Sequence, residues 1–265
     1  MCIISNFLRI VFIFTAQGNS MQYALVNGIK SEPKKGLIGI CIGCGNRMTA
    51  KCGLIKLHHW AHCINVQCDS WWEPETEWHR LWKSHFQEQE REKTFYDTQL
   101  QEYHRADVYT RRGVTIEFQN SPLALEELLS RERFYSQLVW VVNGLKFKGF
   151  SVTEAIPNPR QAELKDYEFT GTSHLAFRRI EAGLEGAGNQ TISIRHPSMR
   201  HIKLSSKHFT FSWRHPHMGW YGAQAPVFID IGGHFLYWLR VIKQHSEDFY
   251  YLQIVNKKDF LEKYC

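Results

Sequence analysis

Five of the seven cysteines lie between positions 41 and 68, and this clustering constrains the fold of the 265-residue chain more than any other feature. A secreted disulfide framework would spread an even number of cysteines along the chain. Cysteines that are clustered and interleaved with histidines are instead typical of metal ligation in a reducing compartment. The segment therefore predicts a small module stabilised by metal. The other two cysteines, Cys2 and Cys265, lie at the chain ends and are expected to be incidental.

The ligand spacing in this segment favours zinc. Cys41 and Cys44 form a C-x2-C pair, and His59 and His62 form an H-x2-H pair further along the chain. Two thiolates and two imidazoles are a ligand set for tetrahedral zinc, and these spacings are close to those of structural sites. The four residues are therefore the predicted zinc ligands.

Two alternative ligand sets remain open. Cys63 and Cys68 would complete a site of four thiolates, and His62 with Cys68 would complete a mixed site. In each case the zinc is structural, because a closed site does no chemistry but folds a segment that is too small to fold alone. Ligand-type residues that do not bind the ion would form ordinary polar surface around it.

The positive charge of the chain is concentrated in the same segment. The formal net charge is +6 and the sequence pI is about 8.9. Positions 21–62 contain six Lys or Arg residues and one acidic residue, Glu32. Such a surface permits a polyanionic partner, and Lys51 is the candidate nucleic-acid contact within it. The alternative is an ordinary solvated surface.

Residues 1–20 contain an apolar stretch that is interrupted by Arg9. A membrane-spanning helix needs about 18 or more apolar residues, so this stretch is too short to cross a bilayer. One interpretation is a signal peptide, because positions 8–16 resemble a short apolar core. We favour an N-terminal extension upstream of a natural start at Met21. No later segment is apolar enough to span a membrane, so we expect a soluble, cytoplasmic protein with no membrane partner.

Hydrophobic periodicity predicts a definite order of helices and strands after the cysteine-rich segment. Proline and acidic residues mark a helix N-terminus at 73–74, and the apolar stripe of this helix continues towards Arg91. Three strands, a second helix and a fourth strand then follow, at 94–97, 105–110, 114–119, 125–136 and 138–142. This order describes a mixed sheet with helices on its faces, that is, an α/β or α+β fold.

The second half of the chain gives weaker patterns. Loops are expected where Gly, Pro or polar residues are frequent, at 155–160, 183–189 and 216–226. Strands are expected at three apolar runs, 227–231, 234–241 and 249–255, and a closing helix begins at Lys257. The C-terminal region is therefore predicted to be rich in strands.

Two carboxylates are expected to meet on adjacent strands. Asp107 lies in one predicted strand and Glu117 in the next, with a tight turn at 111–113 between them. Strand alternation places Glu117 and Gln119 on the same face. Converging carboxylates form a hard-oxygen site that suits Mg²⁺ or Mn²⁺, which can activate water and stabilise charge on a phosphodiester. The alternative is that these acids lie on solvated strand faces.

Side chains on the two predicted helices extend this site. Glu75, His79 and Lys83 recur every four residues beside the apolar stripe of the first helix, so a carboxylate or imidazole there could contact the same metal or its water. Arg131 and Tyr135 are four residues apart on the second helix and are candidate phosphate contacts. The alternatives are ion pairs along a helix flank, worth a few tenths of a kcal/mol each, and an ordinary exposed helix face.

Several linked motifs in this order resemble the competence protein CoiA-like family. Beside the C-x2-C pair they are His-Trp-Ala-His at 59–62, Cys-Asp-Ser-Trp-Trp-Glu at 68–73, Glu-Thr-Glu-Trp-His-Arg-Leu-Trp-Lys at 75–83, His-Arg-Ala-Asp-Val at 104–108, Ile-Glu-Phe-Gln-Asn-Ser at 116–121, Arg-Glu-Arg-Phe-Tyr at 131–135 and Val-Trp-Val-Val-Asn-Gly at 139–144. The resemblance covers residues 41–144 closely and is looser at 225–231.

The resemblance implies a nuclease of the restriction-endonuclease-like PD-(D/E)xK superfamily, preceded by a zinc-finger-like segment. It implies that Asp107 and Glu117 are the metal-binding acids. It also implies that Glu75, Glu77 or His79 supplies the contribution of the first helix to catalysis.

The same resemblance places Gln119 where the superfamily more often has lysine, a departure that is usual in the family. Glutamine can orient the attacking water but cannot add positive charge to the transition state. The implied core of helix, three strands, helix and strand agrees with the order read from periodicity. Four regions follow: an N-terminal extension at 1–20, a zinc-binding segment at 21–70, a nuclease core at 71–145, and a C-terminal region at 146–265 that extends the nuclease fold.

The leading expectation is a Mg²⁺- or Mn²⁺-dependent endonuclease or exonuclease that acts on DNA during uptake, recombination or repair, with recombination or repair proteins as partners. The zinc segment would grip DNA or brace the catalytic helix. DNA is preferred to RNA from the resemblance alone. A second hypothesis is a non-catalytic, zinc-containing nucleic-acid-binding accessory protein. A third is a protein-interaction module whose aromatic-rich second half docks a partner.

Overall fold

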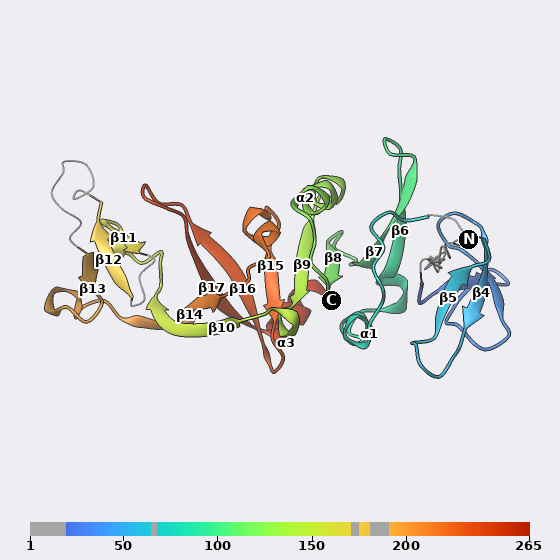
Figure 1. The fold of residues 1–265 in the computed structure, drawn as a ribbon, viewed down its shortest axis with the longest axis horizontal. Helices are drawn as coiled ribbons and strands as arrows, with labels where there is room; N and C mark the ends of the chain where they lie inside the picture. The colour runs from blue at the N-terminus through green and yellow to red at the C-terminus, as the bar shows by residue number, and fades with distance from the viewer. Residues whose placement is uncertain (1–19, 65–67, 171–174, 181–190) are drawn as a thin grey trace, which may run out of the picture. The chain divides into compact units, whose positions relative to one another are not determined.

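The computed structural model describes residues 20–64, 68–170, 175–180 and 191–265 (Figure 1). In this part of the chain the fold mixes α and β structure and is mostly sheet, with three α-helices. The chain divides into two compact units. The N-terminal unit comprises Met1–Glu77 and Thr94–Arg105, and the C-terminal unit comprises Trp78–Lys93 and Ala106–Cys265.

A five-stranded antiparallel sheet with the order β2-β1-β3-β4-β5 forms the N-terminal unit. Its strands are short: β1 (Ala24–Val26), β2 (Ile29–Ser31), β3 (Ile38–Ile40), β4 (Arg47–Lys51) and β5 (His59–His62). Its core consists of Met21, Met48 and Trp60, packed with Cys41 and Cys68. A core this small rarely stabilises a fold without help, so we expect the unit to depend on a metal site.

A nine-stranded mixed sheet has the order β10-β14-β17-β16-β15-β9-β8-β7-β6, and its last two strands cross the boundary between the units. The strands are β6 (Arg91–Asp97), β7 (Glu102–Tyr109), β8 (Thr115–Gln119), β9 (Leu138–Asn143), β10 (Phe150–Pro157), β14 (Leu204–Trp213), β15 (Val227–Asp230), β16 (Phe235–Ile242) and β17 (Phe249–Asn256). β9 pairs in parallel with both β8 and β15, so β15 lies beside β9 although it is far away in the sequence (Figure 1).

The three α-helices are α1 (Glu77–Ser84), α2 (Leu125–Phe134) and α3 (Lys257–Tyr264). From α1 to β9 the elements follow the predicted order of helix, three strands, helix and strand, and the three later strands and α3 lie close to their predicted ranges. In the described residues, no helix has the length and hydrophobicity that crossing a bilayer requires.

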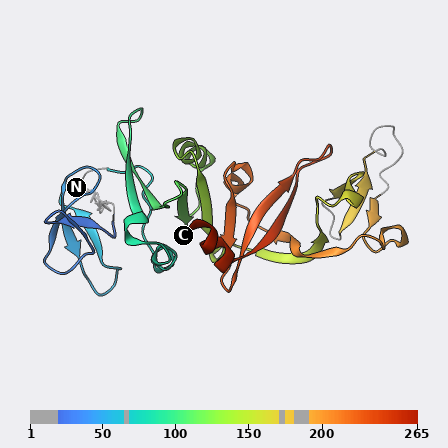
Figure 2. The ribbon, with the colours of Figure 1, turned by 180° about the vertical axis from the view of Figure 1, so that it is seen from behind.

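The two faces of β9 pack against different helices. Val141 belongs to a core that also contains Trp82 of α1 and Phe260 of α3. Helix α3 is dark red in Figure 2. Trp140 projects from the opposite face, because successive strand residues alternate. Its indole N–H donates a hydrogen bond of 3.0 Å to Glu132 of α2. The sheet is therefore covered by helices on both faces near β8 and β9.

A buried carboxylate joins α1 and α3 to the sheet. Asp230, the last residue of β15, accepts hydrogen bonds from the indoles of Trp78 (3.1 Å) and Trp82 (2.9 Å), and the Lys257 ammonium lies 2.7 Å from its other oxygen. Burial alone would raise the pKa of Asp230, but Lys257 and the main-chain N–H of Gly232 hold that pKa below its ordinary value. The carboxylate is therefore ionised and fixes α1 in place.

α1 is shorter than the predicted helix at both ends. It begins at Glu77, four residues later than expected. After the helix, the Arg91 guanidinium donates to the main-chain oxygen of Ser84, the last residue of α1, at 3.2 Å. Such contacts satisfy carbonyl groups that a helix end leaves open. The prediction that the helix continues towards Arg91 is therefore wrong.

Two of the predicted loops also need correction. The loop expected at 155–160 is partly strand, because β10 continues to Pro157 and pairs with β14 over residues that are distant in sequence. The loop expected at 216–226 contains a 3-10 helix, η6 (Met218–Gly222). The loop expected at 183–189 lies outside the described residues.

A third, small sheet in the C-terminal unit consists of β11 (Tyr167–Thr170), β12 (Ala176–Arg179) and β13 (Thr191–Ser193). Glu168 of β11 is buried and accepts hydrogen bonds from Arg178, from Ser246 Oγ and from the main-chain N–H of His245. Burial raises the pKa of Glu168, but these hydrogen bonds outweigh it and lower the pKa from 4.5 to about 2.

Glu168→Gln is expected to lower the free energy of unfolding at pH 7 by roughly 2 kcal/mol. Because the folded-state pKa is lower than the ordinary value of 4.5, the charged group stabilises the fold fully above pH 4.5, and this contribution is lost as the pH falls towards 2. Urea unfolding of both proteins between pH 7 and pH 3 should therefore show a difference that shrinks with acidification. A difference that is independent of pH would contradict this role.

Candidate functional site

Four ligand-type side chains converge in the N-terminal unit. The sulfurs of Cys41, Cys44 and Cys68 and a ring nitrogen of His62 all lie within 4.8 Å of one another. The Cys41 and Cys68 sulfurs are 3.7 Å apart, and the Cys44 sulfur is 3.2 Å from His62 Nε2. A tetrahedral zinc ion with ordinary bond lengths would separate two sulfurs by about 3.8 Å and a sulfur from a nitrogen by about 3.6 Å. The donor set and its spacing therefore fit zinc.

A tight turn positions the first two ligands. Gly45 donates its N–H to the Cys41 oxygen (3.1 Å) and has a φ of 71°, in the left-handed region that favours glycine. The Cys41 N–H in turn donates to the Asn46 oxygen (2.8 Å). The Asn46 side-chain amide donates to the Cys44 sulfur (3.2 Å), a contact that stabilises a thiolate ligand.

The fourth residue of the cluster is Cys68 and not the predicted His59. Both histidines of the H-x2-H pair lie in β5, where successive side chains point to opposite faces. His62 shares a face with the buried Trp60, whereas His59 lies on the other face and contacts the main-chain oxygen of Leu57 at 2.8 Å. The set that combines His62 with Cys68 is therefore the one that the fold brings together.

The contact between Cys41 and Cys68 shifts the pKa values of the two thiols in opposite directions. A hydrogen bond from the Cys68 thiol lowers the pKa of Cys41 to about 3, although burial opposes this change. The same contact raises the pKa of Cys68, so the two sulfurs share one proton. A divalent cation would stabilise both thiolates, and its binding would release that proton.

The other cysteines of the segment lie outside the cluster. Cys63 is exposed and its sulfur contacts Thr49 Oγ1 at 3.1 Å, while Cys52 is half-buried. Lys51 is exposed at the end of β4, and its contact with nucleic acid stays a prediction.

The two predicted catalytic carboxylates lie where the ladder between β7 and β8 ends. The last pair in the ladder is Val108 with Ile116, and Asp107 and Glu117 are the next residue on each strand. Asp107 Oδ2 accepts a hydrogen bond from the main-chain N–H of Phe118 at 2.9 Å. The carboxylate therefore takes the place of the main-chain oxygen that would accept this N–H if the ladder continued. The sheet is thus locally opened where the carboxylates lie.

Lys83 brings a buried positive charge from α1 to this point. Its ammonium lies 2.9 Å from Glu92 Oε1 and 3.9 Å from Asp107 Oδ1. Glu92 has a φ of 50°, a left-handed conformation that costs a non-glycine residue roughly 1–2 kcal/mol. Strain of this kind concentrates at functional sites. Lys83 was expected only as one member of a helix flank, and Glu92 was not among the predicted site residues.

Glu117 is buried against α2. Its Oε2 lies 3.3 Å from the guanidinium of Arg131, which also pairs with Glu127 one helical turn earlier. Arg131 and Tyr135 were predicted to contact phosphate, with an ordinary exposed helix face as the alternative. Both side chains are buried, as is Leu128 of α2, so the exposed-face alternative is wrong. Contact of the two residues with phosphate stays a prediction.

Gln119 lies on the same face of β8 as Glu117, as alternation predicts, and it is buried. Its side-chain amide donates to the main-chain oxygen of Ser121 (3.2 Å) and to the Ser121 hydroxyl (3.3 Å). These contacts fix the orientation of the amide beside the turn that follows β8.

The three residues that the first helix was predicted to contribute belong to different units. Glu75 precedes α1, so the four-residue spacing from Glu75 to His79 does not describe one helix face. Glu75 and Glu77 belong to the N-terminal unit. His79 is buried in α1 and its ring meets the edge of Trp78 at a centroid distance of 5.3 Å. A catalytic role for these three residues stays a prediction.

Lys83→Met is expected to lower the free energy of unfolding by about 3 kcal/mol, because it leaves the buried Glu92 without its cation. In the double variant with Glu92→Gln, both charges are absent, so the two losses should not add and the coupling should reach at least about 1 kcal/mol. A double-mutant cycle by urea unfolding at pH 7 measures this coupling. Additive losses would show that the pair is not energetically linked.

No family model, curated protein or solved structure matches the chain. The competence-protein resemblance therefore stays a proposal that rests on the motifs themselves.

Proposed function

We propose that the chain is a metal-dependent nuclease that hydrolyses phosphodiester bonds of DNA, similar to the competence protein CoiA-like family. The observation that carries the proposal is the placement of Asp107 and Glu117 at the open end of the β7–β8 ladder, with Lys83 beside Asp107. The order of elements from α1 to β9 supports a restriction-endonuclease-like core. The cluster of three cysteines and one histidine supports a zinc-ribbon-like N-terminal unit.

The two carboxylates suit Mg²⁺ or Mn²⁺. Mg²⁺ usually keeps several waters and binds through one or two carboxylates and the phosphates of its substrate, so Asp107 and Glu117 are a sufficient protein contribution. When bound, the ion would supply positive charge at the phosphodiester. Glu117 Oε2 lies 3.3 Å from the Arg131 guanidinium, longer than a strong charge-assisted hydrogen bond of about 2.7–2.9 Å, and Arg131 also pairs with Glu127, so Arg131 would keep one carboxylate partner if Glu117 bound a cation.

Two further side chains have defined tasks in this proposal. Gln119, whose amide is fixed by Ser121, would orient the attacking water through hydrogen bonds. Lys83 would supply the charge that a glutamine cannot, because its ammonium lies beside Asp107 and would stabilise negative charge that develops on the phosphate. Gln119 and Lys83 would together replace the single lysine that the superfamily more often has next to its second acid.

The N-terminal unit would bind the substrate backbone. Its exposed basic residues are Lys34, Lys35, Arg47, Lys51 and Lys56. Phosphate contacts by lysine and arginine dominate nucleic-acid affinity and make it dependent on salt. We further propose that the protein acts in the cytoplasm on DNA during uptake, recombination or repair, because a cluster of reduced thiols suits a reducing compartment.

The purified full chain, incubated with labelled single-stranded DNA, duplex DNA and RNA, tests the proposal. Cleavage of DNA should require Mg²⁺ or Mn²⁺ and should stop on addition of a chelator. Binding of DNA without cleavage in either metal would contradict a nuclease.

A non-catalytic, zinc-containing nucleic-acid-binding protein is the second candidate. The observation that favours it is that both acids already have partners within the fold, Phe118 for Asp107 and Arg131 for Glu117. In that case the two acids would stabilise the fold. Replacing them with the isosteric amides, Asp107→Asn and Glu117→Gln, would then lower the free energy of unfolding without changing the affinity for DNA.

A further inference from the structure

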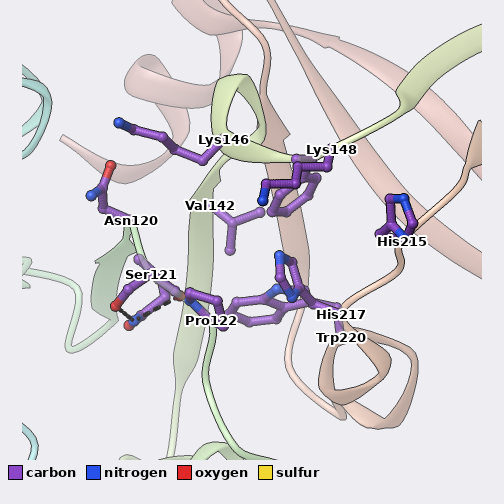
Figure 3. A pocket seen from close by; sticks show the side chains of 11 residues that line it. Asn120, Ser121, Pro122, Val142, Lys146, Lys148, His215, His217 and Trp220 are labelled. Carbon is purple, nitrogen blue, oxygen red and sulfur yellow. Dashed lines mark hydrogen bonds between the residues drawn. The ribbon is translucent and has the colours of Figure 1, made fainter.

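A cavity of about 250 Å³ in the C-terminal unit adjoins the proposed catalytic glutamine. Gln119 itself lines the cavity and donates hydrogen bonds to Ser121. Ser121 and Pro122 also line it (Figure 3). No acidic side chain is among the described residues that line it. A ligand in this cavity would therefore lie next to the proposed reaction centre in a surrounding without negative charge.

Two lysines supply positive charge at the cavity. Lys146 and Lys148 lie in the segment that follows β9 and both are exposed. In the described part of the chain neither lysine forms an ion pair. Lys148 and His217 both line the cavity and are labelled in Figure 3. An anionic group that enters would meet cations that no carboxylate already neutralises.

Three aromatic rings of the wall, those of Phe147, His217 and Trp220, pack against other rings. Trp220 packs edge-on against Trp140 at a centroid distance of 5.5 Å. Phe147 stacks on Trp213 at 4.3 Å, and the His217 ring lies 5.5 Å from Phe147. Burial lowers the pKa of His217, so its imidazole is neutral at neutral pH and offers a flat, uncharged ring.

The segment that carries the lysines is also fixed in place. A Cβ atom added at Gly144, two residues before Lys146, would lie 2.5 Å from Ile229 Cγ2, so the main chain there packs directly on β15. Asn143 donates its side-chain amide to Asn120 at 2.9 Å, which joins the ends of β9 and β8. The cavity is therefore built by rigid elements and is preformed.

We propose that this cavity binds one unpaired nucleotide of the DNA strand next to the scissile phosphate. Its base would lie against His217 and Trp220, and its phosphate would contact Lys146 and Lys148. The proposal rests on the nuclease function proposed above. The volume is below the range of about 300–1,000 Å³ that holds drug-sized ligands, so one base fits and a base pair does not. Stacking on aromatic rings accepts any base, so the site should recognise single strands without sequence preference.

Fluorescence anisotropy with a labelled thymidine oligonucleotide, in Ca²⁺ to prevent cleavage, tests the site. In Lys146→Ala/Lys148→Ala, the slope of log affinity against log salt concentration should become smaller in magnitude by about 1.4. This is about 0.7 for each phosphate contact that is lost with a single strand. The matched control is Lys203→Ala/Lys207→Ala, which removes two exposed lysines elsewhere in the same unit. We expect the control to keep the salt dependence of the original chain.

His217→Ala tests the stacking wall separately. It should weaken binding of the single strand about 5-fold or more while leaving the affinity for a blunt duplex unchanged, because a paired base has no access to the cavity. Photo-crosslinking with an oligonucleotide that carries 5-iodouracil should attach it to the peptide that contains His217 and Trp220.

Three results would overturn the proposal. The first is the same salt dependence in the lysine double variant and in its control. The second is a loss of duplex binding in His217→Ala that equals its loss of single-strand binding. If DNA is still cleaved in either case, the nuclease stands and this site is refuted. The third is a chain that neither binds the oligonucleotide nor cleaves DNA, which refutes both. Binding that depends on the cavity, without cleavage in any metal, would support the site and refute the nuclease.

Discussion

Asp107→Asn and Glu117→Gln are each expected to lower the rate of metal-dependent DNA cleavage by at least about 10²-fold. Each substitution removes one negative charge from the proposed metal site and keeps the shape of the side chain. In Asp107→Asn, the amide oxygen of the new side chain can still accept the main-chain N–H of Phe118, so the interrupted ladder should persist. In Glu117→Gln, Arg131 keeps its ion pair with Glu127, which limits the loss of stability. Initial rates at saturating Mg²⁺ measure the effect.

Matched controls separate loss of charge from loss of fold. Asp259→Asn in α3 and Glu126→Gln in α2 make the same chemical changes at exposed helix positions. Both controls should cleave at the original rate. Thermal unfolding of all four variants tests whether the fold is intact. Site variants that are folded and still cleave at the original rate would refute the catalytic assignment.

Removal of zinc is expected to unfold the N-terminal unit. Structural zinc contributes about 10–16 kcal/mol in zinc-finger peptides, far more than the small core of Met21, Met48 and Trp60 can replace. A strong chelator should therefore abolish the ordered structure of this unit, as measured by hydrogen exchange of its main-chain amides. Because the cluster thiols must lose protons to bind, the zinc affinity should also fall as the pH is lowered. A chelated chain with unchanged exchange would contradict a structural metal.

Single substitutions identify the zinc ligands. Elemental analysis should find one zinc ion per chain in the original protein and in His59→Ala, and less in His62→Ala and Cys68→Ser. Cys63→Ser is the matched control for a cysteine outside the cluster, and it should retain the ion. Loss of zinc in His59→Ala together with retention in Cys68→Ser would restore the ligand set expected from spacing alone.

Local patterns predicted much of the element order because each signal was strong within its own segment. The continuous apolar run at 138–142 became β9, and the amphipathic segment from Leu125 became α2. The tight turn at 111–113 placed Asp107 and Glu117 on neighbouring strands. These features depend on residues that are close in sequence, so periodicity and turn chemistry suffice to find them.

The errors arose where distant residues decide the structure. The strand at 150–157 depends on its pairing with β14, which is distant in sequence. The contact of Lys83 with Glu92 requires a left-handed residue that no pattern signals. By contrast, the choice of Cys68 over His59 was open to prediction, because alternation along β5 already separates His59 from His62.

A crystal structure of the full chain with Mn²⁺ and a DNA strand that carries a non-cleavable phosphorothioate tests the central claim most directly. We expect an anomalous scattering peak for manganese between the carboxylates of Asp107 and Glu117, with the Lys83 ammonium near the bound phosphate. A DNA complex in which manganese is absent from these carboxylates, and in which they keep their contacts with Phe118 and Arg131, would contradict the account.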